Sequence, residues 1–278
     1  MQSREPINTR INSMESFLSS LERNIERQLF VFGFRTLFLA EDYITKTGNY
    51  IPDVTLLFNE SFFNGSIFGE SSDVLEGAKY SDIVNEINYY ASKINVDVSF
   101  DAPSIEVTQD NPWEIKLIFS ANLTMSDKSG LAMWQRQETV NSSIGIRGFE
   151  DPLYIVNTNA KIASKINKTI YEGIYVSGND VSNLLSHMQA GYYTSNTEAP
   201  SFLNRLSGNL TADKNGIESL VDLSRLSGQG ITVSDKSVVD YIYFSASNPA
   251  NKAVNGMPSW FKLDDAHLAK YNATGLAY

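Results

Sequence analysis

The N-terminal part of the chain carries the hydrophobic pattern that most constrains its fold. Up to Ile25, apolar residues recur at alternating intervals of four and three, the spacing of a coiled-coil seam. After Gln28, apolar residues cover most of the helical circumference, which predicts burial on all sides. We therefore expect one helix over residues 7–47, whose first half projects or pairs with a partner and whose second half lies in the globular body. The first half presents an assembly seam formed by Ile7, Ile11, Met14, Leu18, Leu21 and Ile25.

A change in hydrophobic period separates a helical part of the chain from a sheet. Residues 81–95 keep a helical period, whereas short alternating runs follow at 96–100 and 105–107. A longer alternating run over 113–125 returns over 131–146 after a turn, which is typical of a hairpin. This order predicts an antiparallel meander with one buried face that packs on a helix. The expected fold class is α+β: a long N-terminal helix packed on the meander, followed by a second mixed α/β region.

The segment Gly148–Pro152 breaks the strand pattern, and we place a domain boundary there. The predicted domains are 1–48 (the long helix), 49–150 (a helix plus the sheet) and 151–278 (the second mixed region). Residues 49–80 read as irregular, and residues 155–174 fit a strand or a helix equally well. In the second region we expect a helix over 181–192, a short element of uncertain type over 216–223, a strand over 238–245 and a closing helix over 264–271.

Composition excludes several classes of function. The chain has no cysteine, which removes thiol catalysis, cysteine-ligated zinc, iron–sulfur clusters and disulfides. Its net charge is −10 and no window gathers a Lys/Arg cluster, so we expect no nucleic-acid partner. No apolar run approaches the length that spans a bilayer, and Met1 is followed by polar residues rather than by a signal peptide. The chain is therefore either cytoplasmic or lacks an export segment that the native protein carries.

Candidate catalytic and metal-binding residues each have a simpler interpretation. His187 lies in a predicted helix, where a buried histidine is the ordinary reading, and no nucleophile motif accompanies it. Asp264, Asp265 and His267 offer oxygen and imidazole ligands, but Asp264 equally suits a helix N-cap. Glu150 and Asp151 are adjacent acids, and adjacency does not make carboxylates converge. We predict no catalytic residue, no metal and no cofactor.

Two features of the surface are indicated by residue type. Tyrosine and phenylalanine are abundant, and such side chains anchor sugars or protein partners when they are exposed. Sequons of the form Asn-x-Ser/Thr are more frequent than chance, and a glycan on them demands an exposed site in an exported protein. The candidate glycosylation sites are Asn59, Asn64, Asn122, Asn141, Asn167, Asn209 and Asn272.

Two segments carry a resemblance to a known group of proteins. The first is Ile7-Asn-Thr-Arg-Ile-Asn-Ser-Met-Glu-Ser-Phe17 with its continuation to residue 37, and the second is Gly148-Phe-Glu-Asp-Pro-Leu-Tyr154. Together they resemble archaeal cell-surface proteins of unknown function that have a single N-terminal membrane span and a pilin-like layout. The resemblance implies an extracellular domain on a membrane anchor that is absent from this sequence. Its partners would be copies of itself or other envelope proteins, reached through the N-terminal helix.

Three hypotheses for function remain. The preferred one is a non-catalytic extracytoplasmic domain with a structural, assembly or adhesion role, located at the outer face of the cell membrane and soluble without its anchor. An alternative is an extracellular small-molecule sensor with one enclosed polar pocket. Another is a hydrolase of envelope polymers that uses Glu150 or Asp151, which requires converging acids and a perturbed pKa.

Overall fold

The computed structural model describes residues 4–278, and the side chains from Asn8 onward. These residues form two compact units. Unit 1 contains the chain up to Leu39, Asp53–Thr108 and Glu114–Ile144, and unit 2 contains Ala40–Pro52, Gln109–Trp113 and Gly145–Tyr278. The α+β class is confirmed, with a long N-terminal helix, an antiparallel meander and a second region of mixed elements.

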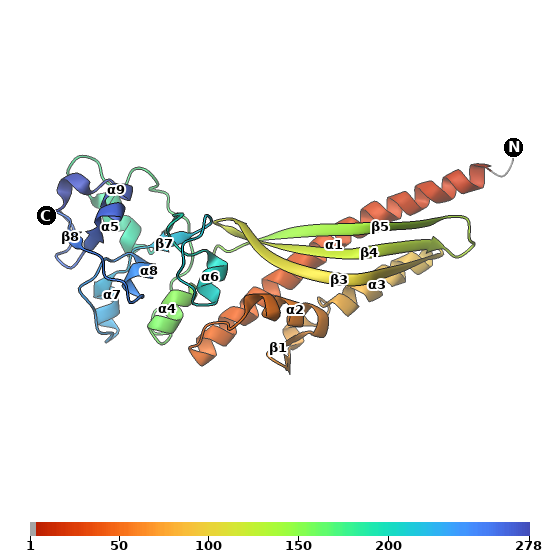
Figure 1. The fold of residues 1–278 in the computed structure, drawn as a ribbon, viewed down its shortest axis with the longest axis horizontal. Helices are drawn as coiled ribbons and strands as arrows, with labels where there is room; N and C mark the ends of the chain where they lie inside the picture. The colour runs from red at the N-terminus through yellow and green to blue at the C-terminus, as the bar shows by residue number, and fades with distance from the viewer. Residues whose placement is uncertain (1–3) are drawn as a thin grey trace. The chain divides into compact units, whose positions relative to one another are not determined.

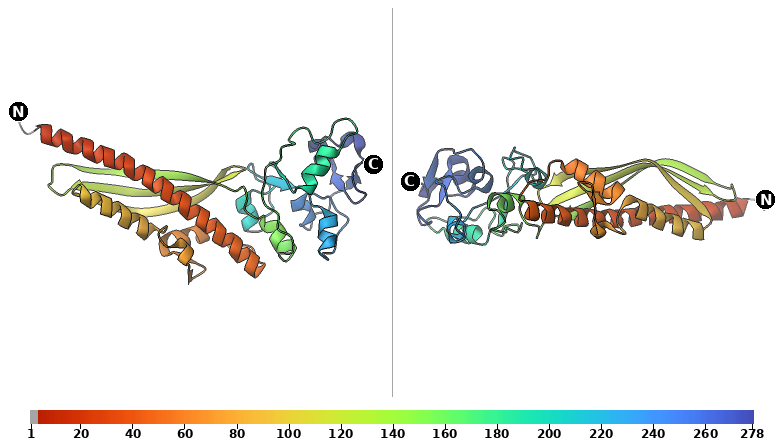
Figure 2. Two further views of the ribbon diagram at one scale, coloured as in Figure 1. Left: turned by 180° about the vertical axis from the view of Figure 1, so that it is seen from behind. Right: turned by 90° about the horizontal axis from the view of Figure 1, so that it is seen from below.

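Unit 1 is a three-stranded sheet with helices on one face (Figures 1 and 2). The sheet has the strand order β3-β4-β5, and α1 and α3 lie side by side along it. Its elements, of which α1, β3 and β5 end in residues assigned to unit 2, are α1 (Arg4–Thr47), α2 (Val54–Asn64), β1 (Ser66–Ile67), β2 (Glu70–Ser71), η1 (Asp73–Leu75), α3 (Tyr80–Lys93), β3 (Val96–Asn111), β4 (Glu114–Asp127) and β5 (Met133–Gly145). No helix of the described residues is both long enough and apolar enough to cross a membrane.

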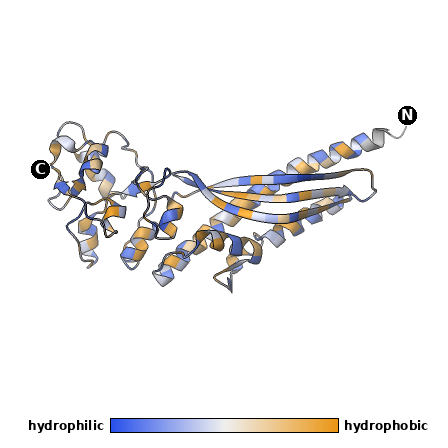
Figure 3. Cartoon of the chain, in the orientation of Figure 1, coloured by the Kyte–Doolittle hydropathy of each residue, from blue (hydrophilic) through white to orange (hydrophobic). Residues whose placement is uncertain are grey.

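The sheet follows the alternation of apolar and polar residues along its strands (Figure 3). In β4, every second residue from Ile115 to Met125 is buried, and the residues between them face outward. The two short runs expected at 96–100 and 105–107 belong to one strand, β3. Ala102 has a φ of 48°, and the buried positions change from even to odd residues across it. Such a shift marks a β-bulge, which explains why the sequence reads as two strands.

Helix α1 packs directly on the sheet. A Cβ atom added at Gly33 would lie 2.6 Å from Leu117 Cδ1 and 2.7 Å from Ile144 Cδ1, so the glycine marks a close approach of α1 to β4 and β5. Towards its N-terminus, Arg10 Nε donates to Asp127 Oδ1 at 2.8 Å. These contacts hold the helix along the meander, as the change in hydrophobic period predicts.

Helix α2 was missed because its sequence is apolar on most sides and shows no period. The structure shows that caps define it: Asp53 Oδ1 accepts a hydrogen bond from Leu56 N at 2.9 Å, and Gly65 ends it with a φ of 67°. Phe62 of α2 then meets the ring of Phe32 at a centroid distance of 4.9 Å. The expectation that residues 49–80 are irregular is therefore wrong, because this segment contains a core helix.

Unit 2 consists of short elements around an apolar core. The helices expected over 181–192 and 264–271 are confirmed as α5 and α9, whereas the strand expected over 238–245 is wrong because α8 lies there. The strands pair antiparallel as β6–β7 and β8–β9. The elements are α4 (Pro152–Asn157), α5 (Ser182–Gln189), β6 (Tyr193–Ser195), α6 (Phe202–Leu206), β7 (Ile217–Ser219), α7 (Leu223–Gly228), α8 (Asp240–Tyr243), β8 (Asn251–Ala253), β9 (Lys262–Asp264), α9 (Asp265–Lys270) and η2 (Thr274–Leu276).

Candidate functional site

The assembly seam of α1 is largely covered by the rest of unit 1. Met14, Leu21 and Ile25 are buried, and Ile11 and Leu18 are half-buried. The remaining seam residue, Ile7, lies outside the side chains that the structure describes. The seam therefore packs against its own chain, so a charge at Leu21 would disturb the core before it disturbed any assembly.

A different face of α1 is exposed and aromatic. Phe30, Phe34 and Phe38 are 46%, 48% and 50% exposed, and their spacing of four residues places them on one face. The expectation that the second half of α1 is buried all round holds for Leu29 and Phe32 but is wrong for these three rings. We call Phe30, Phe34 and Phe38 the aromatic row.

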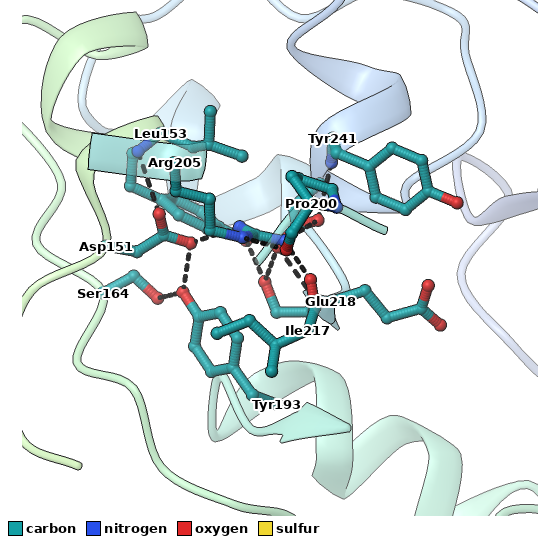
Figure 4. A network of polar contacts seen from close by, with 12 residues as sticks. Asp151, Leu153, Ser164, Tyr193, Pro200, Arg205, Ile217, Glu218 and Tyr241 are labelled. Atoms are coloured by element: carbon teal, nitrogen blue, oxygen red, sulfur yellow. Dashed lines mark hydrogen bonds and ion pairs between the residues drawn. The ribbon is translucent and has the colours of Figure 1, made fainter. Parts of the chain in front are cut away.

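Unit 2 encloses an ion triad centred on Arg205 (Figure 4). Arg205 Nη1 lies 2.6 Å from Asp151 Oδ2 and 3.0 Å from Asp240 Oδ2, and all three side chains are fully buried. Tyr193 donates its hydroxyl to Asp151 Oδ2 at 2.9 Å, and Ser219 Oγ donates to Asp240 Oδ2 at 2.7 Å. Such donors replace the water that the two carboxylates lose on burial.

The triad carries one more negative than positive charge. Burial, with the negative charge of Asp151 adding to it, raises the pKa of Asp240 in spite of the guanidinium. Burial alone would lower the pKa of Arg205, but the two carboxylates outweigh it and raise that pKa. The three side chains are closed to solvent, and their ion pairs join the N-cap of α4 to α6 and α8 within unit 2.

The two acids of the hydrolase hypothesis have different surroundings. Asp151 belongs to the enclosed triad and also caps α4, where its Oδ1 accepts from Leu153 N at 2.9 Å. Glu150 is half-buried, and burial together with the negative charge of Glu41 raises its pKa. Glu150 therefore has the perturbed pKa that the hypothesis requires, but Asp151 is not accessible to a polymer.

A second buried network surrounds His267. Its Nδ1 lies 2.8 Å from Asp264 Oδ1, and its Nε2 lies 3.1 Å from Glu218 Oε2. Asp264 is also the N-cap of α9, as the sequence indicates. Both ring nitrogens therefore face carboxylates. Among the described residues, no group of three or more His, Asp or Glu side chains is placed to hold a metal ion.

The charge of His267 makes the stability of unit 2 depend on pH. Burial lowers its pKa, but the hydrogen bonds and charges of Asp264 and Glu218 outweigh this effect and raise the pKa to about 9. A raised histidine pKa stabilises the fold fully below the unfolded value near 6.5, and this contribution is lost as pH rises through about 9. We expect unit 2 to lose about 2 kcal/mol of stability between pH 7 and pH 9, below the range in which the tyrosines of the unfolded chain titrate. Urea unfolding at a series of pH values measures the loss, which His267→Gln should abolish; an unchanged pH slope in that variant would contradict the assignment.

His187 is a buried core histidine, as the simpler interpretation predicts. Its Nδ1 lies 2.9 Å from Thr169 Oγ1, and its ring meets Tyr175 edge-on at 5.1 Å. Burial lowers the pKa of His187 to about 4, so the ring is neutral at physiological pH. It therefore serves packing in unit 2.

The candidate glycosylation sites differ in accessibility. Asn59 and Asn167 are half-buried, and Asn59 Nδ2 donates a hydrogen bond to Thr55 O at 3.0 Å. Among the abundant tyrosines, the neighbours Tyr89 and Tyr90 are both exposed. The exposed sequon asparagines are Asn64, Asn122, Asn141, Asn209 and Asn272.

Sequence reasoning did not single out Arg205, Asp240 or Glu218. Arg205 follows a polar residue in a short helix, and nothing in the local pattern marks it as buried. The aromatic row had a visible signal, the spacing of four residues, but the apolar residues between its members masked it.

Comparisons with known proteins found no relative of this chain. No protein-family model matches the chain, and no curated protein or solved structure is significantly similar to it.

Proposed function

We propose that this chain is the non-catalytic extracytoplasmic domain of a membrane-anchored, pilin-like cell-surface protein, and that its copies assemble through the aromatic row. The row supports the proposal because three neighbouring phenylalanines on one helix face, each about half exposed, leave apolar surface that a partner would cover. The order of elements, a long helix followed by an antiparallel meander, is the layout that the resemblance implies.

The size of the row determines the kind of assembly. Full burial of a phenylalanine stabilises by about 1.5–3 kcal/mol, so the exposed half of each ring offers about 1 kcal/mol. Six rings from two copies then offer roughly 6 kcal/mol, which only matches the lower range of the cost of association. One contact between two copies is therefore weak, and stable assembly requires each copy to make several contacts at once, as in an array or a filament.

Replacement of Phe30, Phe34 and Phe38 by serine is expected to abolish self-association. The hydroxyl side chains remove the apolar surface while α1 stays anchored by its buried face. Multi-angle light scattering at increasing protein concentration measures the effect. We expect the average mass of the unaltered chain to rise with concentration and that of the triple-serine variant to remain at one chain.

Ile170→Ser is the matched control, because Ile170 is an exposed apolar residue of unit 2. This variant should associate like the unaltered chain. A single-chain mass for the unaltered protein at every concentration would reject assembly through the row.

The location at the cell surface is tested by a separate measurement. Protease applied to intact source cells should release peptides of both units, and recovery of the protein only after lysis would refute a surface location.

A further inference from the structure

A groove of about 610 Å³ runs between α1 and α3 within unit 1. Its volume falls within the range of small-molecule sites, about 300–1,000 Å³. Helix α1 borders it from Phe17 to Arg27, a rise of about 15 Å along the helix axis. The groove is lined by Phe17, Ser20, Leu21, Arg23, Asn24, Arg27, Glu86, Ile87, Tyr90, Lys93 and Ile94.

The lining of the groove includes an apolar strip. Leu21 and Ile87 are buried beneath it, while Phe17 and Ile94 are half-buried and add apolar surface. Tyr90 remains 51% exposed. Because these residues come from both helices, the strip can accept an apolar chain that lies along the groove.

The rims of the groove are cationic although the chain is acidic overall. Arg23 and Arg27 stand on α1 and Lys93 stands on α3, against a net charge of −10 for the whole chain. The single acid of the lining, Glu86, accepts a hydrogen bond from Gln28 Nε2 at 2.6 Å and lies 3.8 Å from Arg27 Nη2. Arg27 is thus partly neutralised inside the groove.

The other two cations have no acidic partner among the residues that the structure describes. Arg23 forms no ion pair there, and Lys93 lies over the ring of Tyr89 with its Nζ 4.6 Å from the centroid. They approach the groove from its two opposite helices. An anion placed between them would meet one charged donor from each side.

We propose that this groove binds a single-chain amphiphile with an anionic head group, such as a fatty-acid carboxylate. The head group lies between Arg23 and Lys93, and the chain lies on Phe17, Leu21 and Ile94. A small inorganic anion would leave the apolar strip uncovered, and a neutral amphiphile would leave both cations unused. The proposal is independent of assembly through the aromatic row.

Titration calorimetry with sodium decanoate below its micelle concentration tests the proposal. The triple-serine variant of the aromatic row is used, so that self-association does not contribute to the heat. We expect one decanoate to bind per chain, and decyl maltoside and decyltrimethylammonium to bind at least about tenfold more weakly. In this background, Arg23→Glu and Lys93→Glu should each weaken decanoate binding by about tenfold or more, since each removes a charge-assisted hydrogen bond.

Lys161→Glu is the control for net charge, because Lys161 is exposed and is not among the residues that line the groove. It should leave decanoate binding unchanged, and Arg23→Lys should retain most of the affinity. Equal affinity for the three amphiphiles would show that the groove is an unspecific apolar surface, which contradicts the proposal. Absence of saturable decanoate binding, or full affinity in both Glu variants, would overturn the proposal, whatever the mass measurements show for the aromatic row.

Discussion

Replacement of Arg205 by methionine is expected to lower the free energy of unfolding of unit 2 by about 3–5 kcal/mol. Methionine keeps much of the apolar stem but leaves Asp151 and Asp240 enclosed without their cation. Two carboxylates at such close quarters repel each other, and each has lost a charge-assisted donor. Hydrogen exchange followed by mass spectrometry along a urea series measures the loss, because peptides of unit 2 are resolved from peptides of unit 1.

The control for this prediction is Arg225→Met. Arg225 is exposed and donates its Nη2 to Ala163 O at 2.9 Å, so its replacement should change the stability by less than about 0.5 kcal/mol. The double variant Arg205→Met with Asp240→Asn should recover part of the loss, because it removes one of the two stranded charges. If Arg205→Met loses no more stability than Arg225→Met, the triad does not hold unit 2 together.

The long elements of unit 1 were predictable because each has its own hydrophobic period, which the missed helix α2 lacks. Alternating intervals of three and four mark α1, and alternation by two marks β4 from Ile115 to Met125. The hydrophobic pattern could not show which surface packs against the apolar face of each element. The seam of Leu21 and Ile25 is equally compatible with a second copy and with the chain's own sheet, and only the structure distinguishes the two.

Unit 2 was harder to predict because tertiary contacts override local preference there. Residues 238–245 are rich in β-branched and aromatic side chains, which favours a strand. In the structure, Asp240 accepts hydrogen bonds from Ser219 N at 2.9 Å and from Tyr241 N at 2.6 Å while it pairs with Arg205. These bonds fix the backbone as the short helix α8. No local sequence pattern predicts the contact between Arg205 and Asp240.

The candidate surfaces were predictable only in part. Sequence reasoning expected exposed apolar surface along the seam of α1, whereas the exposed apolar side chains of the second half of that helix form the aromatic row. The seam follows a regular spacing, whereas the row lies among Leu29, Phe32 and Leu37, which are buried. The groove between α1 and α3 depends on residues about 70 positions apart, Arg23 and Lys93, and cannot be read from spacing.

Replacement of Gly33 by valine is expected to destabilise unit 1 by about 2–3 kcal/mol. The glycine faces Leu117 and Ile144, and a Cβ atom alone would approach their Cδ1 atoms to 2.6 Å and 2.7 Å. Valine adds two further methyl groups at this point, so α1 must move away from the sheet or the core side chains must leave their rotamers. Hydrogen exchange of α1 and β4 peptides along the same urea series measures the loss.

Two further variants separate crowding from helix propensity. Ser19→Val places the same side chain at an exposed position of α1, where serine and valine have similar propensities, so little change is expected. Gly33→Ala gains up to about 1 kcal/mol of helix propensity but introduces the first close contact, so its stability should lie between those of the glycine and valine forms. Equal stability of Gly33→Val and Ser19→Val would mean that α1 does not pack on the meander at Gly33. The aromatic row would then lose the fixed support on which its exposure, and the assembly proposed from it, depends.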